Sequence, residues 1–344
     1  NVGITQMLAE MQRLAGAAYV QGYTESTDFP TENPIEGDHA GGADAFLTKL
    51  APAGDDLVYS TYLGGSENEL PGRVEVDEDG AAYVVGSTPS TDFPVVGATA
   101  TFEADDDAYI AKINPAGSAF EYSRPMGLTG PELAQSIAVT ANGSAVITGV
   151  VQAFDPLGSV LVATISPDGG AVTESFSING SLSDTGFGVA VRAGAIYVTG
   201  LTQSPNFPTV NAYQPLDSSP GLFDPSPFVL KLNDEGLVYS TYLGDTGGGM
   251  DIAVDGAGSA HVVGDSQSGP FPAVEALQTE RAGDGDAFIT KFAPDGRSLE
   301  FSTLYGGTSI DGARAVDLSP TGSIVTAGRT DSGNYPLEQP LQGN

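Results

Sequence analysis

One phrase of strands and turns recurs six times along the chain, and this repeat constrains the fold more than any other sequence feature. Each copy holds a short apolar strand that ends in Gly, a long loop, and two further strands joined by a tight turn. The copies begin near residues 18, 82, 145, 195, 260 and 323, at intervals of 64, 63, 50, 65 and 63 residues. A period of that length, built from strands and turns, predicts a radial or stacked β array. We therefore expect residues 1–344 to form a single repeat domain.

Each copy divides into four predicted strands. In the second copy, for example, an inner strand at residues 74–77 is followed by a Gly-containing turn and by a second strand at residues 82–86. In the first copy, a third strand at residues 44–50 turns through Pro52-Ala53-Gly54 into an outer strand at residues 58–64. Pro presets the first corner of such a turn, and Gly takes the left-handed position after it. Four-stranded antiparallel units arrayed around an axis form a β-propeller, so the predicted fold class is all-β, with four-stranded antiparallel blades.

The strand sequences resemble the SBBP β-propeller repeat of bacteria and archaea. The resemblance lies in Asp44-Ala45-Phe46, in Tyr59-Ser60-Thr61-Tyr62-Leu63-Gly64 and in Ala82-Tyr83-Val84-Val85-Gly86, with their echoes in other copies. It implies a propeller, found mostly in large secreted or surface proteins, and no general enzymatic activity. We therefore expect an extracellular or cell-surface location.

The number of blades follows from the count of strands. Six inner hairpins are visible but only five pairs of third and outer strands, whereas the SBBP family is named for seven blades. We favour six blades, and the alternative is part of a seven-bladed or longer array. Residues 8–15 are expected to supply the inner strand of the first blade. Residues 1–7, or a neighbouring chain, are expected to complete the last blade, which makes self-assembly through blade completion an option.

The chain is strongly acidic, with 44 Asp and Glu against 12 Lys and Arg and a formal net charge of −32. Such a surface repels nucleic acid and anionic membranes and attracts cations. No run approaches the roughly 18 apolar residues of a membrane span. We therefore expect no nucleic-acid partner and no membrane insertion.

Three short acidic clusters are candidate calcium sites. They contain Asp77 and Asp79 in a hairpin turn, and two pairs at the entry to a third strand, Asp105 with Asp107 and Asp284 with Asp286. Closely spaced Asp side chains and backbone carbonyls supply the oxygen ligands that Ca²⁺ prefers. The alternative is structural, because Asp is also an ordinary turn former.

The loops between second and third strands are long, and long loops on a rigid scaffold are where function usually lies. We therefore take the long-loop face as the candidate working surface. Each such loop except that of the shortened third copy carries Phe-Pro or Tyr-Pro, as at Phe29-Pro30 and Tyr335-Pro336. We interpret these aromatic residues as plugs that pin the loops, and the third copy as an irregular blade with a gap in the long-loop rim.

Catalytic motifs are scarce. Neither His39 nor His261 has another His or a Cys near it in the sequence that would indicate a zinc site, and no Gly-x-Ser-x-Gly elbow occurs. The sequence thus favours a non-enzymatic structural or interaction module of a cell surface, secreted assembly or filament. Its partners would be other proteins or surface polymers bound at the long-loop face. The alternatives are a carbohydrate- or peptide-binding propeller and a calcium-dependent hydrolase or lyase.

Overall fold

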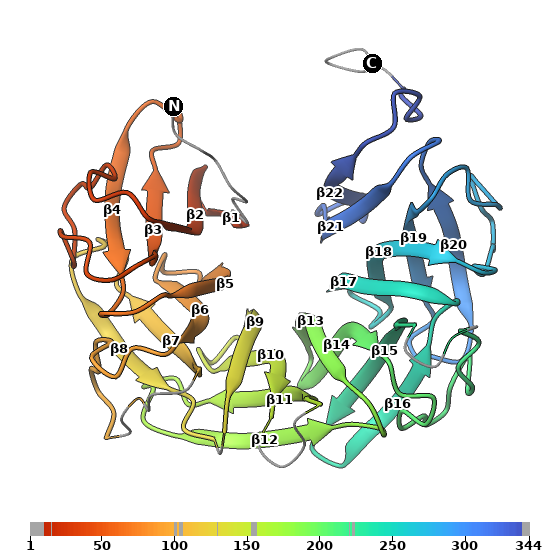
Figure 1. Cartoon of the computed structure of the whole chain (residues 1–344), viewed down its shortest axis with the longest axis horizontal. Helices are drawn as coiled ribbons and strands as arrows, with labels where there is room; N and C mark the ends of the chain where they lie inside the picture. Colours follow the sequence, from red (N-terminus) through yellow and green to blue (C-terminus); the bar gives the residue numbers. More distant parts are fainter. Residues whose placement is uncertain are drawn as a thin grey trace. The chain divides into compact units, whose positions relative to one another are not determined.

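The structure, a computed structural model, describes residues 10–14, 16–99, 102, 106–128, 130–152, 157–219, 221 and 224–338. Its strands form five four-stranded antiparallel sheets and one two-stranded sheet (Figure 1). The chain divides into two compact units, Asn1–Pro156 with Leu161–Ser177 and Leu157–Val160 with Ile178–Asn344. The predicted all-β propeller of four-stranded blades is confirmed. The prediction of six complete blades is not confirmed, because the sixth sheet has only two strands among the described residues.

Three sheets lie in the first unit, except for Ser159, Val160 and Ile178 at the strand ends of the third sheet. Their strands, in chain order, are β1 (Glu10–Leu14), β2 (Ala17–Thr24), β3 (Asp44–Leu50) and β4 (Leu57–Leu63); β5 (Leu70–Val76), β6 (Ala82–Thr88), β7 (Asp107–Ile113) and β8 (Phe120–Pro125); and β9 (Glu132–Val139), β10 (Ala145–Val151), β11 (Ser159–Ile165) and β12 (Val172–Ile178). Strand β1 pairs with β2, which confirms the inner strand expected in residues 8–15. Residues 1–7 lie outside the described residues.

The second unit holds the remaining sheets. Their strands are β13 (Asp184–Arg192), β14 (Ala195–Thr202), β15 (Ser226–Asn233) and β16 (Gly236–Tyr242); β17 (Thr246–Val254), β18 (Ala260–Ser268), β19 (Asp286–Phe292) and β20 (Leu299–Tyr305); and the pair β21 (Asp311–Leu318) and β22 (Ile324–Thr330). In each complete sheet the strands are hydrogen-bonded in chain order. In this simple meander the second strand of each complete sheet lies between the first and the third strands of that sheet.

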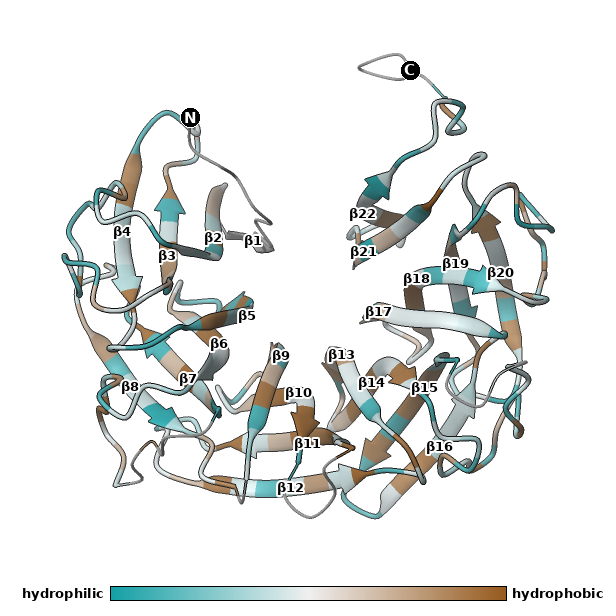
Figure 2. Ribbon diagram, viewed as in Figure 1, coloured by the Kyte–Doolittle hydropathy of each residue, from teal (hydrophilic) through white to brown (hydrophobic). Residues whose placement is uncertain are grey.

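Hydrophobic residues concentrate on the strands, whereas the connecting loops are mostly hydrophilic (Figure 2). Middle strands such as β6 and β10 are buried at every residue. The predicted plugs are confirmed, because the Phe29 ring lies 4.5 Å from Phe46 and the Phe271 ring 4.8 Å from Phe288. Aromatic contact of this kind fixes each long loop to its own sheet.

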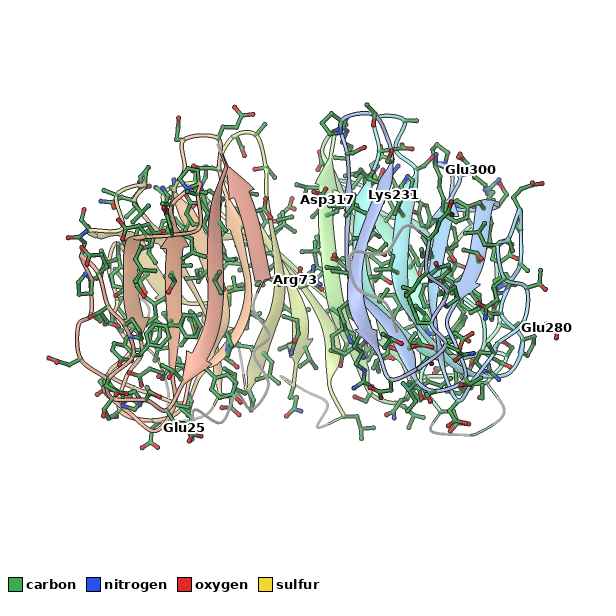
Figure 3. All side chains as sticks on the ribbon, turned by 90° about the horizontal axis from the view of Figure 1, so that it is seen from above. Glu25, Arg73, Lys231, Glu280, Glu300 and Asp317 are labelled. Atoms are coloured by element: carbon green, nitrogen blue, oxygen red, sulfur yellow. The ribbon has the colours of Figure 1, made fainter. Side chains whose placement is uncertain are left out.

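Tight turns and long loops occupy opposite edges of each sheet, as a four-stranded meander requires. In the second unit, Figure 3 shows Lys231, Glu300 and Asp317 towards the tight-turn edge and Glu280 towards the long-loop edge. The long loops also pair with the outer strands, through bridges such as Val210 to Ser240 and Val274 to Ser302. The loops therefore form a fixed edge on which a site can be built.

The third sheet is regular in its strands. Strand β12 pairs with β11 although its sequence departs from the repeat, and its middle residues are exposed. The shortened connection between β10 and β11 includes residues 153–156, so the predicted gap in the long-loop rim lies partly outside the described residues. The described residues contain no helix that is long and apolar enough to cross a membrane.

Candidate functional site

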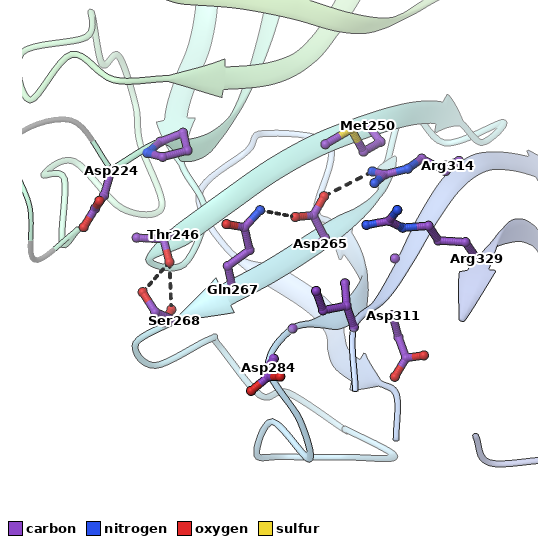
Figure 4. A pocket seen from close by; sticks show the side chains of 14 residues that line it. Asp224, Thr246, Met250, Asp265, Gln267, Ser268, Asp284, Asp311, Arg314 and Arg329 are labelled. Atoms are coloured by element: carbon purple, nitrogen blue, oxygen red, sulfur yellow. Dashed lines mark hydrogen bonds and ion pairs between the residues drawn. The ribbon is translucent and has the colours of Figure 1, made fainter. Parts of the chain in front are cut away.

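A pocket of about 530 Å³ lies at the long-loop edge of the second unit (Figure 4). It is formed where β17, β18, β21 and β22 meet the loops that precede β15 and β19. Its charged and polar lining includes Asp224, Thr246, Asp265, Gln267, Asp284, Asp311, Arg314 and Arg329. The pocket thus combines four carboxyl groups with two guanidinium groups at the surface that sequence analysis selected.

Three consecutive glycines, Gly247–Gly249, lie in the inner strand β17 beside this pocket. Gly247 has a φ of 149°, and a Cβ there would collide with the Asp265 carbonyl oxygen. A Cβ on Gly249 would collide with the Thr199 hydroxyl. Side chains are therefore excluded from these two positions of β17. Met250 follows this run and lines the pocket.

Asp265 is held by other side chains at both of its carboxyl oxygens. Its Oδ1 lies 3.2 Å from Arg314 Nη1, and its Oδ2 accepts a hydrogen bond of 2.8 Å from Gln267 Nε2. The Asp265 side chain is 9% exposed and that of Arg314 is 39% exposed. A carboxyl group that is held at both oxygens is fixed in orientation.

Arg329 and Asp284 are two charged residues of the pocket whose side chains are uncommitted. Neither side chain makes a hydrogen bond or ion pair with another described residue, and Figure 4 draws no dashed line to either. Both residues are exposed. A guanidinium group without an acid partner can receive an anionic ligand in the planar, bidentate geometry that carboxylates and phosphates share.

Two buried acidic junctions lie beside the sheets, one in each unit. We call Glu36, Asp44 and Glu69 around Gly64 the first junction, and Gln278, Asp286 and Asp311 around Gly306 the second. A Cβ on Gly64 would lie 2.7 Å from Glu69 Oε2 and 2.9 Å from Asp44 Oδ1. A Cβ on Gly306 would lie 2.6 Å from Asp286 Oδ1 and 2.8 Å from Asp311 Oδ2. Each glycine therefore stands where two carboxyl groups converge.

Hydrogen bonds hold these carboxyl groups without satisfying all their oxygens. Glu69 Oε1 accepts from Thr88 and Ser90, and Asp311 Oδ2 accepts from Gly307 N and Ser332. Within the part of the chain that the structure describes, Glu69 Oε2 and the Oδ1 atoms of Asp286 and Asp311 are buried without a hydrogen-bond partner. Burial raises the pKa of Glu69, and burial with the nearby Asp44 and Glu69 raises the pKa of Glu36 to about 7.

The predicted calcium ligands do not converge on one point. Asp77 is engaged in its own turn, where it accepts from Asp79 N and Ala81 N, and it lies 3.5 Å from Lys112 Nζ. Asp284 lines the pocket, whereas Asp286 belongs to the second junction.

Asp107 is buried at the start of β7, and Asp105 lies outside the described residues. Among described residues, no group of three or more His, Asp or Glu side chains is arranged to hold a metal ion. The calcium sites stay a prediction.

Except for Asp284, sequence reasoning missed the charged residues that line the pocket. Asp265 and Arg329 occupy the same repeat position, directly after the Gly that ends the second-strand phrase. Other copies have Tyr23, Ser87 and Leu201 there. The negative charge of Asp265 and the positive charge of Arg329, at a repeat position that is uncharged in the other copies, were the sequence signal that could have indicated the pocket.

Comparisons with known proteins agree with this architecture. The SBBP family, described as "Beta-propeller repeat", matches residues 58–94 and 238–272. The chain carries SBBP β-propeller repeats. Both matched segments run from an outer strand through the next inner hairpin to a Phe-Pro loop, which confirms the resemblance noted in the sequence. No curated protein sequence matches the chain significantly.

Several solved structures resemble the SBBP-repeat chain in fold. The NanB sialidase of Streptococcus pneumoniae is 8% identical with a TM-score of 0.50, and the alignment covers 93% of this chain and 64% of that one. A gluconolactonase of Xanthomonas campestris is 12% identical with a TM-score of 0.42, at 92% and 88% coverage. An exo-β-1,3-galactanase of Clostridium thermocellum is 12% identical with a TM-score of 0.40, at 95% and 73% coverage. The chain spans less than two thirds of the NanB chain.

The NanB sialidase corrects one expectation from the sequence. We expected a non-enzymatic structural or interaction module, but this propeller of similar fold is an enzyme. At such low identity the likeness shows the fold alone, and the chemistry has to come from the pocket itself.

Proposed function

We propose that this chain is a propeller hydrolase whose active site is the pocket at the long-loop edge of the second unit. Its substrate is a carbohydrate that carries an anionic group. The observation that carries the proposal is a fixed carboxylate, Asp265, in the same pocket as an uncommitted carboxyl group, Asp284, and an uncommitted guanidinium, Arg329.

Glycoside hydrolysis commonly uses two carboxyl groups in different environments. The contacts of Asp265 with Arg314 and Gln267 hold its side chain in one orientation. A side chain held in this way suits a nucleophile or a group that stabilises positive charge on the sugar. Asp284 has no such contacts and is exposed, so it is free to exchange a proton with the leaving oxygen or with water.

The arginines indicate the charge of the substrate. Arg314 is neutralised by Asp265, but Arg329 is not neutralised by any described residue. An anionic substituent on the sugar would offset this charge and orient the substrate. In support, the structure of the NanB sialidase was solved in complex with a substituted ammonio-ethanesulfonate, a zwitterion that carries an anionic sulfonate group.

The proposal is tested by assaying the protein against chromogenic glycosides in neutral and carboxylated forms. We expect turnover of a carboxylated substrate, and a loss of about 10²- to 10⁴-fold in kcat for Asp265→Asn and for Asp284→Asn. Asp79→Asn, an exposed turn residue outside the pocket, serves as the matched control and should retain full activity. The absence of turnover on every substrate, or full activity in Asp265→Asn, would refute the proposal.

Arg329 is tested by the same assay. Arg329→Gln should raise KM for the carboxylated substrate by about tenfold or more, because a charged hydrogen bond contributes about 1.5–3 kcal/mol. It should change the kinetics of the neutral substrate little. Equal effects on both substrates would show that Arg329 does not recognise the anionic group.

A further inference from the structure

The second junction leaves two buried carboxyl oxygens without a partner. Asp286 and Asp311 are both 0% exposed. Within the described part of the chain, the Oδ1 atom of each residue has no hydrogen-bond partner, and neither residue forms an ion pair. Burying a carboxylate without a compensating charge destabilises a fold. The two groups therefore require a proton or a cation.

The aspartate at the start of the third strand is held differently in the two junctions. Asp44 of the first junction accepts backbone hydrogen bonds at both oxygens, 3.1 Å at Oδ1 and 2.7 Å at Oδ2. The two hydrogen bonds to Asp286, from a backbone amide and from Gln278, both reach Oδ2. Its Oδ1 is directed at Gly306, where a Cβ would lie 2.6 Å from it. An open oxygen on this aspartate therefore distinguishes the second junction.

The loops that precede β19 and β21 carry the two acids and are packed against each other. Asp311 N donates a hydrogen bond of 2.8 Å to Gly285 O. A Cβ on Gly283 would lie 2.4 Å from Ser309 O and 2.7 Å from Gly307 O. Backbone carbonyl oxygens and carboxyl oxygens thus lie where the loops meet. Ca²⁺ accepts both kinds of oxygen in a flexible geometry, whereas Mg²⁺ demands a nearly ideal octahedron.

The same two loops form part of the lining of the proposed hydrolase pocket. Asp284 and Gly285 line it from the loop before β19, and Ile310 and Asp311 line it from the loop before β21 (Figure 4). Asp311 therefore belongs to both the second junction and the pocket. A cation held by Asp286 and Asp311 would join the loops and restrict the movement of Asp284.

We propose that the second junction binds a calcium ion through Asp286 and Asp311, and that the ion orders the loops that carry Asp284. Gln278 is neutral, so the two carboxylates balance the charge of one Ca²⁺. The calcium site stands on the contacts of the junction alone. Its role in ordering the pocket for catalysis rests on the proposed function.

Binding is tested by titrating calcium chloride into the chelator-treated protein in a calorimeter. We expect saturable binding to the unaltered protein, at least tenfold weaker in Asp286→Asn and in Asp311→Asn. Circular dichroism checks that each variant folds.

Two further variants are the matched controls. Asp77→Asn alters another candidate calcium ligand, and Glu69→Gln alters the first junction, where Glu69 Oε2 is buried without a hydrogen-bond partner among the described residues. Both should bind calcium as the unaltered protein does. No saturable binding to the unaltered protein, or undiminished binding to both junction variants, would overturn the proposal. Loss of binding in Glu69→Gln with none in Asp286→Asn would also overturn it, because the ion would then lie in the first junction.

Hydrogen exchange of the unaltered protein reports on the loops without a variant and without a substrate. Calcium should slow exchange at residues 282–286 and 306–311 by at least tenfold and leave residues 40–44 of the first unit unchanged. Uniform slowing over both units would indicate only screening of the net charge and would overturn the proposal.

The assay with carboxylated glycosides separates this proposal from the proposed function. Chelator should lower kcat at least tenfold, calcium should restore it, and Asp286→Asn should respond to neither. Calcium binding and slowed exchange in a protein that hydrolyses no glycoside would refute the proposed hydrolysis and support the calcium site. Hydrolysis by a protein that binds no calcium would support the proposed function and overturn the calcium site.

Discussion

The first and second junctions share one plan and differ at one position, where Glu36 stands in the first and Gln278 in the second. Gln278 accepts a hydrogen bond from Gly306 N through its oxygen and donates one from its amide nitrogen to Asp286. Glu36 accepts the equivalent bond from Gly64 N but has no hydrogen to donate while it is ionised. The comparison shows that a buried pair of acids can be held by a neutral amide at any pH, or by a carboxyl group only when that group is protonated.

The largest expected effect tests the shared plan. Gly64→Ala and Gly306→Ala each place a methyl group against two buried carboxyl groups, at 2.6–2.8 Å from the nearest carboxyl atoms. We expect each substitution to destabilise its unit by about 2–4 kcal/mol. Each glycine directly follows an outer strand, β4 or β20, and that strand cannot move away without breaking its pairing.

Denaturant midpoints of the two variants measure this effect. Gly333→Ala is the control, since a Cβ there would meet nothing within 4 Å. A shift below about 0.5 kcal/mol in either variant would mean that the carboxyl groups do not close on the glycine.

The difference between the junctions predicts a dependence on pH. The pKa of Glu36 is raised from 4.5 to about 7, so its contribution to stability is fully present below pH 4.5 and is lost as pH rises through 7. Glu36→Gln should abolish this loss and stabilise the first unit by up to about 3 kcal/mol at pH 8. It should have little effect at pH 4.5.

The reverse exchange provides the control. Gln278→Glu should introduce a similar loss of stability between pH 5 and pH 8 at the second junction. Urea midpoints collected across this range separate the two variants. If the free energy of unfolding of Glu36→Gln and of the unaltered protein depended on pH in the same way, ionisation of Glu36 would not destabilise the protein. The proposed difference between Glu36 and Gln278 would then be wrong.

The second junction also offers the sharpest test of the predicted calcium dependence. With a neutral Gln278, two buried carboxyl oxygens, one each from Asp286 and Asp311, have no partner among the described residues, and a cation would satisfy both. We expect calcium to raise the melting temperature more than sodium chloride of equal ionic strength. The gain amounts to about 2.7 kcal/mol when free calcium is a hundred times its dissociation constant.

Asp286→Asn should remove that gain, whereas Asp77→Asn should keep it, because Asp77 is engaged by its own turn and by Lys112. Equal melting temperatures in calcium and matched sodium chloride would leave only screening of the net charge of −32.

The repeat made the sheets predictable, because each strand is specified by local alternation and by its own turn. The residues 44–50 predicted as a third strand are those of β3, and Phe29 packs on Phe46 as the plug interpretation requires. The pocket was not predictable by the same means. Asp265 and Arg314 are far apart in sequence, and neither belongs to a motif.

The junctions show a further limit of the sequence. Asp286 was singled out as a calcium ligand with Asp284, its neighbour in sequence, but its carboxyl group converges on Gly306 with that of Asp311 of the following sheet. Gly306 joins them, and its role becomes visible only once the two carboxyl groups are placed around it. Periodicity fixes which residues share a sheet, whereas contacts between sheets depend on packing that no single copy of the repeat encodes.

The smallest expected effect concerns the serine that supports each junction. Glu69 Oε1 accepts hydrogen bonds from both Thr88 and Ser90, at 2.6 and 2.7 Å. Asp311 Oδ2 accepts from one hydroxyl, that of Ser332, at 2.8 Å. Ser90→Ala and Ser332→Ala should each cost about 0.5–1.5 kcal/mol, the usual contribution of one hydrogen bond.

The two losses should differ in their pH dependence. The Ser90 hydroxyl lowers the pKa of Glu69 against the burial that raises it, so its removal raises that pKa further and penalises the ionised form. The destabilisation by Ser90→Ala should therefore be larger at pH 8 than at pH 5. Urea midpoints at the two pH values measure it, with Ser66→Ala, whose hydroxyl binds the exposed Asp92, as the surface control. Equal losses at the two pH values would mean that Glu69 has the same protonation state at both, and a larger loss at pH 5 would also contradict the prediction.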